Sequence, residues 1–297
     1  MNPLTLIEGL RPKQWTKNLL VFAGVLFSLK LTQTDLLLRA GAGFLSFSLL
    51  SGAVYLLNDL LDVEADRQHP KKRKRPIASG RLPVAIAWTA IPFVIAASAT
   101  LAWWLGRGFT LVLVVYLVQN MLYSYKLKHQ VILDVMMIAF GFVLRAIAGV
   151  ELLLPVAPDT VMSPWLLVCT FFGALFLGVS KRRREIANSG TSASEQRAVL
   201  RAYTPQLLDV MLTVSASTTL MAYALYTIWP TTVAKYHTEA LLYTVPFVAY
   251  GVFRYLHLVQ VSETSEDPSA VLLSDRPIQA TVLLFLVTAV WVLYFGR

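Results

Sequence analysis

Four oxygen-bearing side chains are spaced along the sequence in a way that suits metal binding. They lie in the stretch NDLLDVEAD, at Asn58, Asp59, Asp62 and Asp66. Each residue of a helix turns by about 100°, so Asn58, Asp62 and Asp66 are offset by only about 40° at each step. Asp59 lies about 100° from Asn58 on the same count. We therefore expect all four side chains to share one helix face, with Glu64 pointing away.

Carboxylates crowded on one face repel one another, and a divalent cation would relieve that repulsion. Oxygen ligands favour Mg²⁺ over Zn²⁺, and Mg²⁺ usually binds substrate phosphate oxygens as well as protein. The spacing therefore predicts a magnesium site for a diphosphate, with Asn58, Asp59, Asp62 and Asp66 as metal ligands. The alternative is a solvated helix end whose carboxylates form ion pairs with the lysines and arginines that follow.

A dense run of cations follows in HPKKRKRPIASGR, residues 69–81. Its first cations, at 71–73, are typical of a segment that lies on anionic lipid headgroups. Arg75 lies beside Pro76 and before Gly80, which predicts a shaped turn, and a guanidinium on such a turn can hold phosphate oxygens. Arg75 is therefore the first phosphate-binding candidate.

Other charged islands supply further phosphate-binding candidates. YSYKLKHQVILD covers 123–134, VSKRRREI covers 179–186, and LRPKQWTKN covers 10–18, where Lys13 and Lys17 are one turn apart on one helical face. Cations at the carboxyl end of a helix also balance its dipole, and this is the alternative explanation for the cations of VSKRRREI. The candidates from these islands and the loop after 186 are Lys17, Lys126, Lys128, Lys181, Arg182 and Tyr203.

Two arginines fall inside apolar stretches, Arg145 and Arg254. An ionisable side chain within a membrane needs a partner or water, so both are candidates for binding a lipid phosphate. The alternatives are snorkelling to the membrane surface for Arg254 and a structural hydrogen bond to neighbouring carbonyls for Arg145.

Composition identifies the elements that position these residues. Of 297 residues, 56% are apolar and 14% are charged, and the mean hydropathy is +0.60. A soluble domain has about 45–50% apolar and about 25% charged residues, so a soluble globular protein is excluded. We expect one all-α integral membrane domain over 1–297, because nine apolar stretches approach the roughly 20 residues that cross a bilayer. The expected spans are 17–30, 36–57, 84–105, 109–124, 133–150, 163–180, 209–229, 240–260 and 278–295.

The net charge of +9 is distributed unevenly between the loops of these spans. Most of the 26 Lys and Arg residues fall on the side of the amino terminus, which the positive-inside rule places in the cytoplasm. The loops 58–83, 124–133 and 181–208 are then cytoplasmic. Nucleic-acid binding is not expected, because no basic segment is interleaved with aromatic residues. The single cysteine, Cys169, excludes disulfide scaffolds and cysteine-rich metal sites.

NDLLDVEAD, at the end of the second of nine spans, resembles the first Asp-rich motif of the UbiA superfamily of intramembrane prenyltransferases. More narrowly, several segments resemble the decaprenyl-phosphate phosphoribosyltransferase group of that superfamily. These segments are RPKQWTKN at 11–18, the whole of 58–80, YSYKLKHQVILD at 123–134, RAIAG at 145–149 and GVSKRRREI at 178–186.

The resemblance implies a UbiA-type helix bundle in a bacterial-type plasma membrane, with its active site on the cytoplasmic side. It implies transfer of the 5-phosphoribosyl group of phosphoribosyl diphosphate to a polyprenyl phosphate, with Mg²⁺ and release of diphosphate. By the pattern of the family, Asn58, Asp62 and Asp66 are the catalytic residues that hold metal and diphosphate. The resemblance is compatible with a homo-oligomer and does not decide the oligomeric state.

One departure from the superfamily pattern bears on the donor. Members with aromatic acceptors carry a second Asp-rich motif after the sixth span, whereas 181–208 offers Glu185 and Glu195 among six cations. A donor with an additional phosphate needs more positive charge, which favours a phosphoribosyl donor. The alternative is transfer of an allylic prenyl group to an aromatic or glycerol-type acceptor at the same metal site. A transporter would carry ionisable residues along a transmembrane path, but here they gather at one surface.

Overall fold

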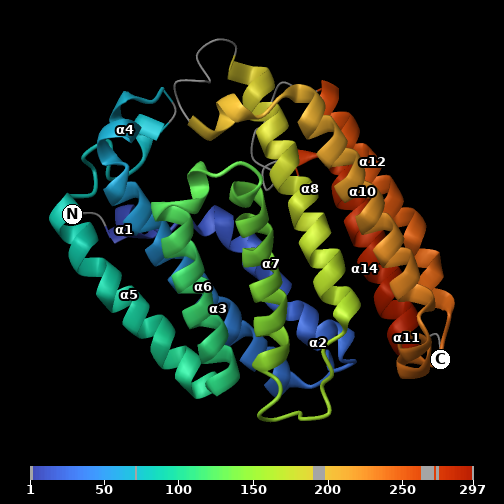
Figure 1. Cartoon of the computed structure of the whole chain (residues 1–297). Helices are drawn as coiled ribbons and strands as arrows, with labels where there is room; N and C mark the ends of the chain where they lie inside the picture. Colours follow the sequence, from blue (N-terminus) through green and yellow to red (C-terminus); the bar gives the residue numbers. More distant parts are fainter. Residues whose placement is uncertain (1–2, 71, 190–197, 262–270, 272–273, 296–297) are drawn as a thin grey trace. The chain divides into compact units, whose positions relative to one another are not determined.

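The computed structural model describes residues 3–70, 72–189, 198–261, 271 and 274–295. All regular elements within these ranges are helices, which confirms the all-α prediction (Figure 1). The chain forms two compact units. The first comprises 1–125 and 144–162, and the second comprises 126–143 and 163–297.

The first unit is built around a long helix, α3 (Thr34–Leu61). Helix α5 (Val84–Leu105) packs along it and α6 (Arg107–Tyr125) packs against α5, so the three lie side by side (Figure 1). Shorter elements complete this unit: α1 (Pro3–Gly9), the 3₁₀ helix η1 (Pro12–Phe22), α2 (Ala23–Phe27), α4 (Val63–Gln68) and the 3₁₀ turn η2 (Lys72–Lys74).

The second unit is built around two helix pairs. Helix α8 (Pro164–Ser189) packs against α10 (Pro205–Ile228), and α12 (Val245–Val261) packs against α14 (Arg276–Tyr294). Its shorter elements are η3 (Leu127–His129), η5 (Ala198–Ala202), α11 (Pro230–Tyr236) and η6 (Ala240–Thr244). Helix α7 (Leu133–Glu151) contributes residues to both units.

Seven helices in the described part of the chain are long and apolar enough to cross a membrane: α3, α5, α6, α7, α8, α10 and α14. They carry exposed large apolar side chains such as Phe93 and Trp103, which suit contact with lipid rather than water. The chain is therefore a multi-pass membrane protein.

The predicted count of nine spans is not confirmed. The span expected at 240–260 consists of η6 followed by the 17 residues of α12. The span expected at 17–30 consists of the end of η1 followed by α2, so the chain there is not one α-helix.

The 3₁₀ conformation of η1 corrects one expectation about its lysines. A 3₁₀ helix has 3.0 residues per turn, so residues four apart differ by about 120° and not by about 40°. Lys13 and Lys17 both lie on η1 and therefore do not share a face.

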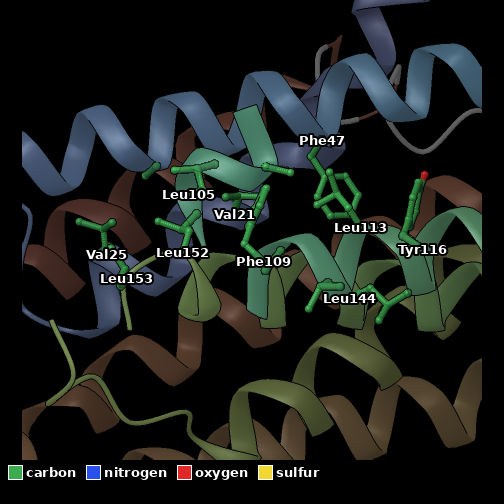
Figure 2. Close-up of a cluster of buried hydrophobic side chains, with 14 of the residues drawn as sticks. Val21, Val25, Phe47, Leu105, Phe109, Leu113, Tyr116, Leu144, Leu152 and Leu153 are labelled. Carbon is green, nitrogen blue, oxygen red and sulfur yellow. The ribbon is translucent and has the colours of Figure 1, made fainter. Parts of the chain in front are cut away.

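The core of the first unit joins η1, α3, α6 and the second half of α7. Val21, Phe47, Phe109 and Leu144 belong to one buried cluster (Figure 2). Two glycines allow backbones to touch beneath this cluster. A Cβ on Gly24 would lie 1.9 Å from the carbonyl oxygen of Gly149, and a Cβ on Gly149 would lie 2.3 Å from that of Val21. The glycine of the RAIAG segment is therefore required by close backbone packing.

Candidate active site

The four predicted metal ligands lie where α3 gives way to α4. Asn58 and Asp59 are in the last turn of α3, Asp62 is the residue between the helices, and Asp66 is in α4. The helical hydrogen-bond spacing continues through this break, because the amide of Asp62 donates to Asn58 O at 2.9 Å and that of Asp66 donates to Asp62 O at 2.8 Å. The chain therefore keeps nearly the periodicity on which the prediction of a shared face depends.

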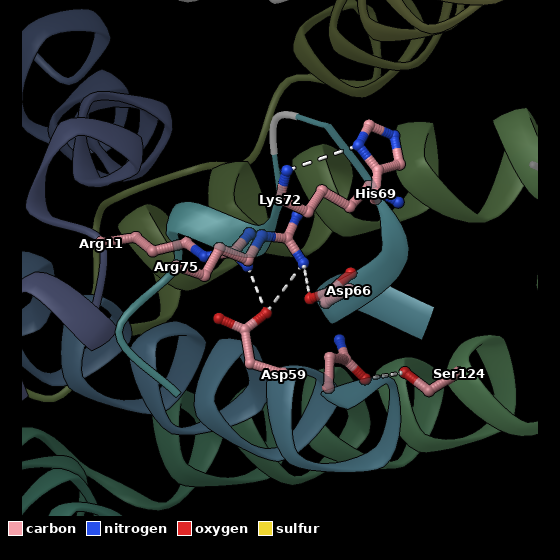
Figure 3. A network of polar contacts seen from close by, with 8 residues as sticks. Arg11, Asp59, Asp66, His69, Lys72, Arg75 and Ser124 are labelled. Atoms are coloured by element: carbon pink, nitrogen blue, oxygen red, sulfur yellow. Dashed lines mark hydrogen bonds and ion pairs between the residues drawn. The ribbon is translucent and has the colours of Figure 1, made fainter. Parts of the chain in front are cut away.

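Arg75 connects two of these carboxylates (Figure 3). Its Nη1 donates to Asp59 Oδ1 at 3.1 Å and to Asp66 Oδ2 at 2.6 Å. Arg11 also donates to Asp59 Oδ1. Both aspartate side chains are only 3% exposed. For Asp59 and Asp66 the structure thus contains the ion pairs named above as the alternative to a metal site.

The remaining members of the predicted set have different surroundings. Asn58 Oδ1 accepts a hydrogen bond from Ser124 Oγ of α6 at 2.7 Å, and Asp62 is half-buried. Glu64 is 76% exposed and accepts from Arg67, as expected for a side chain on the opposite face. Within the described ranges, no group of three or more His, Cys, Asp or Glu side chains is placed to hold a metal ion.

The turn after η2 holds Arg75 in place, as its proline and glycine predict. The amide of Ser79 donates to Arg75 O at 2.9 Å, and Gly80 has a φ of +76°. Ile77, at the centre of the turn, is buried in a cluster with Leu56 and other apolar residues. Burial of Ile77 therefore anchors the segment that carries the guanidinium over the carboxylates.

Arg81 at the end of the same turn is engaged elsewhere. Its guanidinium donates to both carboxylate oxygens of Glu8, at 2.6 and 2.8 Å. These hydrogen bonds hold the pKa of Glu8 below its usual range. Arg81 therefore ties α1 to the turn.

Arg11 contacts the candidate site and is absent from the residues predicted from the sequence. Its side chain lies over the ring of Tyr55, with 4.8 Å from Cζ to the centroid, while it donates to Asp59. The available signal was its position at the start of RPKQWTKN, immediately before Pro12. Lys17, which was a predicted phosphate ligand, is half-buried on η1.

The second unit contains another buried ion-pair network. Arg182 donates through Nε to Asp134 Oδ2 at 2.7 Å and through Nη1 to Glu185 Oε2 at 2.6 Å. Tyr203 donates to Asp134 Oδ1 at 2.6 Å and accepts from the amide of Ile132 at 2.7 Å. Burial and the hydrogen bond to Asp134 both raise the pKa of Tyr203.

This network argues against phosphate binding by two predicted residues. The Arg182 side chain is 2% exposed and holds two carboxylates, and the hydroxyl of Tyr203 has both a donor and an acceptor partner. Three other predicted phosphate ligands of this unit are better placed: Lys126 is exposed at the start of η3, and Lys128 and Lys181 are half-buried. Glu195 lies outside the described residues.

Arg145 has the surroundings of a structural residue and not of a lipid-phosphate ligand. It is buried, and it donates to Asn18 Oδ1 at 2.7 Å and to the hydroxyl of Tyr116 at 3.0 Å. Asn18 in turn donates to Ser48 Oγ at 3.0 Å. A phosphate would have to displace these partners. The structural alternative is therefore favoured, and it includes hydrogen bonds to the side chains of Asn18 and Tyr116.

Arg254, the other lipid-phosphate candidate, is half-buried on α12. It donates through Nη2 to Asp275 Oδ2 at 2.9 Å. Asp275 also caps α14, because its Oδ1 accepts from the amide of Ile278 at 2.9 Å. The ion pair therefore fixes the start of α14 against α12.

An apolar pocket of about 310 Å³ lies among α8, α10, α12 and α14 of the second unit. Its lining includes Phe176, Gly251 and two threonines. Thr219 and Thr281 donate their hydroxyls to carbonyls of their own helices, at 2.7 and 2.8 Å. Each threonine hydroxyl is therefore already satisfied, and the pocket suits a hydrocarbon.

Several known proteins are similar to this chain. Residues 19–276 match the UbiA prenyltransferase family. Decaprenyl-phosphate phosphoribosyltransferase of Mycolicibacterium smegmatis is 32% identical, over 98% of this chain and 93% of the relative. The protein of the same name from Corynebacterium glutamicum is 34% identical, over 97% of this chain and 86% of the relative.

A solved structure of a UbiA homolog from Archaeoglobus fulgidus, bound to GPP and Mg²⁺, has the same fold. Its TM-score is 0.70 at 19% identity, over 97% of this chain and 99% of that one. Because the family match covers most of the chain and the relatives match nearly its whole length, this chain belongs to the UbiA prenyltransferase family.

Proposed function

We propose that this chain transfers the 5-phosphoribosyl group of phosphoribosyl diphosphate to a polyprenyl phosphate and releases diphosphate. The proposal rests on the cluster at the end of α3. There Asp59 accepts hydrogen bonds from Arg75 and Arg11, and Asp66 accepts one from Arg75. Relatives of 32% and 34% identity that bear the name of this activity support it.

The donor brings a diphosphate and a further phosphate to this site. Arg75 and Arg11 supply guanidinium donors that suit phosphate oxygens. Lys126, Lys128 and Lys181 of the second unit stay proposed phosphate ligands, as the sequence predicts. The cationic loops face the cytoplasm of a bacterial-type plasma membrane, where a soluble sugar phosphate is available.

The oxygen chemistry of the carboxylate cluster fits Mg²⁺. Asp59 and Asp66 both accept a hydrogen bond from Arg75 Nη1, which shows that their carboxylates lie close together. Asn58, Asp59, Asp62 and Asp66 would hold the ion after their side chains move, because Asp59 and Asp66 are paired with Arg75 and Arg11 in this structure. When bound, it supplies positive charge that stabilises the leaving diphosphate.

The acceptor needs little activation by the protein. A phosphate monoester is largely dianionic at neutral pH, since its second pKa is about 6, so it attacks without a general base. Its oxygen forms a bond to the anomeric carbon of the ribose, and the bond from that carbon to the diphosphate breaks with the electron pair on the diphosphate. We propose a single displacement with inversion, and a product with retained anomeric configuration would contradict that step.

The hydrocarbon chain of the acceptor requires an apolar surface within the membrane. The pocket among α8, α10, α12 and α14 offers one in the second unit. We assign part of the isoprenoid chain of the acceptor to this pocket.

The test is a transfer assay with purified protein, radiolabelled phosphoribosyl diphosphate and polyprenyl phosphate, with Mg²⁺ or with a chelator. The proposal predicts labelled lipid only with the metal present. Geranyl diphosphate with an aromatic or glycerol-type acceptor serves as the comparison. Consumption of that allylic diphosphate, with no use of phosphoribosyl diphosphate, would replace the proposal by prenyl transfer.

A further inference from the structure

The second unit contains a strained turn whose last residue is hydrogen-bonded to a buried tyrosine hydroxyl. We name residues 126–132 the cationic turn, since they include Lys126 and Lys128. Its last residue, Ile132, has a φ of +70°. This left-handed region is disfavoured for any residue with a Cβ and most of all for a β-branched one. Something outside the turn must therefore hold Ile132 in this conformation.

Tyr203 supplies a contact of this kind. The amide of Ile132 donates to the hydroxyl of Tyr203 at 2.7 Å, and this hydroxyl donates to Asp134 Oδ1 at 2.6 Å. The one hydroxyl therefore fixes the last residue of the turn and the first turn of α7 together. The side chain is buried, so water does not easily replace either bond.

We call the two hydrogen bonds of the Tyr203 hydroxyl, to Ile132 and Asp134, the clamp. The other carboxylate oxygen of Asp134 is held by a separate residue. Arg182 of α8 donates to Asp134 Oδ2 at 2.7 Å, and both side chains are buried. Tyr203 follows η5, which packs against η3 of the cationic turn. The predicted cytoplasmic loops 124–133 and 181–208 are thereby joined through Asp134.

We infer that Tyr203 is a positioning residue for the donor: its hydroxyl holds the cationic turn in the conformation that presents Lys126 and Lys128 to the phosphates of phosphoribosyl diphosphate. The inference rests on the proposed function. Tyr203 acts through the turn and does not itself contact phosphate, because its hydroxyl already accepts from the amide of Ile132 and donates to Asp134.

The test compares Tyr203→Phe with Tyr243→Phe, which removes the same hydroxyl from a 72% exposed tyrosine of the same unit. Since a misplaced binding group costs on the order of 10-fold or more, we expect Tyr203→Phe to raise the KM for phosphoribosyl diphosphate about 10-fold. The KM for polyprenyl phosphate should change by less than about 2-fold, as should both constants in Tyr243→Phe. Equal rises in both KM values, or no rise in either, would overturn the inference.

A rescue variant separates positioning from general damage. Glycine adopts a positive φ without strain, so Ile132→Gly combined with Tyr203→Phe should return the donor KM most of the way to wild type. Failure of this rescue would count against the inference. If Tyr203→Phe does not fold, Ile132→Gly and Ile132→Pro are compared, since proline lacks the amide and forbids a positive φ. A raised donor KM for proline alone supports the inference, and equal values overturn it.

Amide hydrogen exchange of the peptide covering 126–134 makes the result independent of the substrate. Faster exchange in Tyr203→Phe than in Tyr243→Phe is expected whatever the donor is. If wild-type protein does not use phosphoribosyl diphosphate, the proposed function fails while the exchange result still reports on the clamp. If wild-type protein uses it and the donor KM of Tyr203→Phe is unchanged, the inference alone fails.

Discussion

Asp59 and Asp66 share one nitrogen atom, Nη1 of Arg75, at 3.1 and 2.6 Å. They are on different helices, α3 and α4, and both are buried. Two carboxylates this close repel each other, and the guanidinium between them compensates the repulsion. The Arg75 side chain is 29% exposed, in contrast to 2% for Arg182, so its remaining N–H donors can reach a phosphate oxygen of an incoming diphosphate.

Arg75→Gln tests this role of the guanidinium. Loss of a charge-assisted bond to phosphate should raise the KM for phosphoribosyl diphosphate by roughly 10–100-fold, because such bonds contribute about 1.5–3 kcal/mol. The measurement is steady-state kinetics with varied donor at saturating polyprenyl phosphate. Arg73→Gln removes an exposed arginine of the same run and serves as the control. A donor KM equally affected in both variants would show that only the general charge of the loop matters.

Gly251→Phe tests the apolar pocket as the site of the acceptor chain. A Cβ at Gly251 meets no atom within 4 Å, so a benzyl group can extend into the pocket. We expect the KM for a long polyprenyl phosphate to rise about 10-fold, since a filled pocket loses the burial of one or two isoprene units. The KM for phosphoribosyl diphosphate should not change.

Gly41→Phe is the matched control, because a Cβ at Gly41 also meets nothing within 4 Å but lies on α3 of the first unit. If Gly251→Phe behaves like Gly41→Phe, the acceptor chain does not use this pocket.

Asn18→Ala tests whether Arg145 is structural. Removing the carboxamide leaves the buried guanidinium with one hydrogen-bond partner fewer, and a hydrogen bond to a charged group contributes about 1.5–3 kcal/mol. We expect a lower thermal unfolding temperature in detergent, with an unchanged acceptor KM in the folded fraction. Gln130→Ala, at an exposed position, is the control. An unchanged unfolding temperature with a raised acceptor KM would instead return Arg145 to the role of lipid-phosphate ligand.

The local elements were predictable because they depend on short-range pattern. The span predicted at 84–105 coincides with α5, and the spacing of Asn58, Asp62 and Asp66 survives the break between α3 and α4. The partners of these residues were not predictable, because they come from distant parts of the chain. Arg11 and Asp59 are 48 residues apart, and no local signal pairs them.

Contacts with distant parts of the chain also decide two features of the second unit and of η1 that the sequence does not predict. Lys181 and Arg182 are adjacent and equally cationic in sequence, yet only Arg182 is buried, beside an aspartate 48 residues away. The 3₁₀ conformation of η1 accompanies close backbone packing at Gly24 and Gly149, and this tertiary effect overrides local propensity.

The ion pair between Arg254 and Asp275 should make stability depend on acidity. Hydrogen bonds from Arg254 hold the pKa of Asp275 below its usual range. A lowered carboxyl pKa stabilises the fold above the unfolded pKa, and this stabilisation is lost as pH falls through the folded pKa. Asp275→Asn keeps a capping oxygen but lacks the charge, so it should be less stable at neutral pH by up to about 1 kcal/mol.

This difference should shrink toward zero as the pH falls through the folded-state pKa of Asp275, where the wild-type carboxyl also becomes neutral. Thermal unfolding of both proteins across this range checks the prediction. If the difference in stability between wild type and Asp275→Asn is constant with pH, the loss of stability is caused by changed packing and not by the lost charge.

The most direct test of the account compares labelled lipid formation by wild type, Asp62→Asn and Glu64→Gln with radiolabelled phosphoribosyl diphosphate, polyprenyl phosphate and Mg²⁺. Both changes remove one carboxylate from the same segment, but only Asp62 belongs to the proposed metal and diphosphate site. We predict that Asp62→Asn lowers kcat/KM at least about 100-fold, while Glu64→Gln stays within about 2-fold of wild type. Unchanged turnover in Asp62→Asn would contradict the assignment of the carboxylate cluster to catalysis.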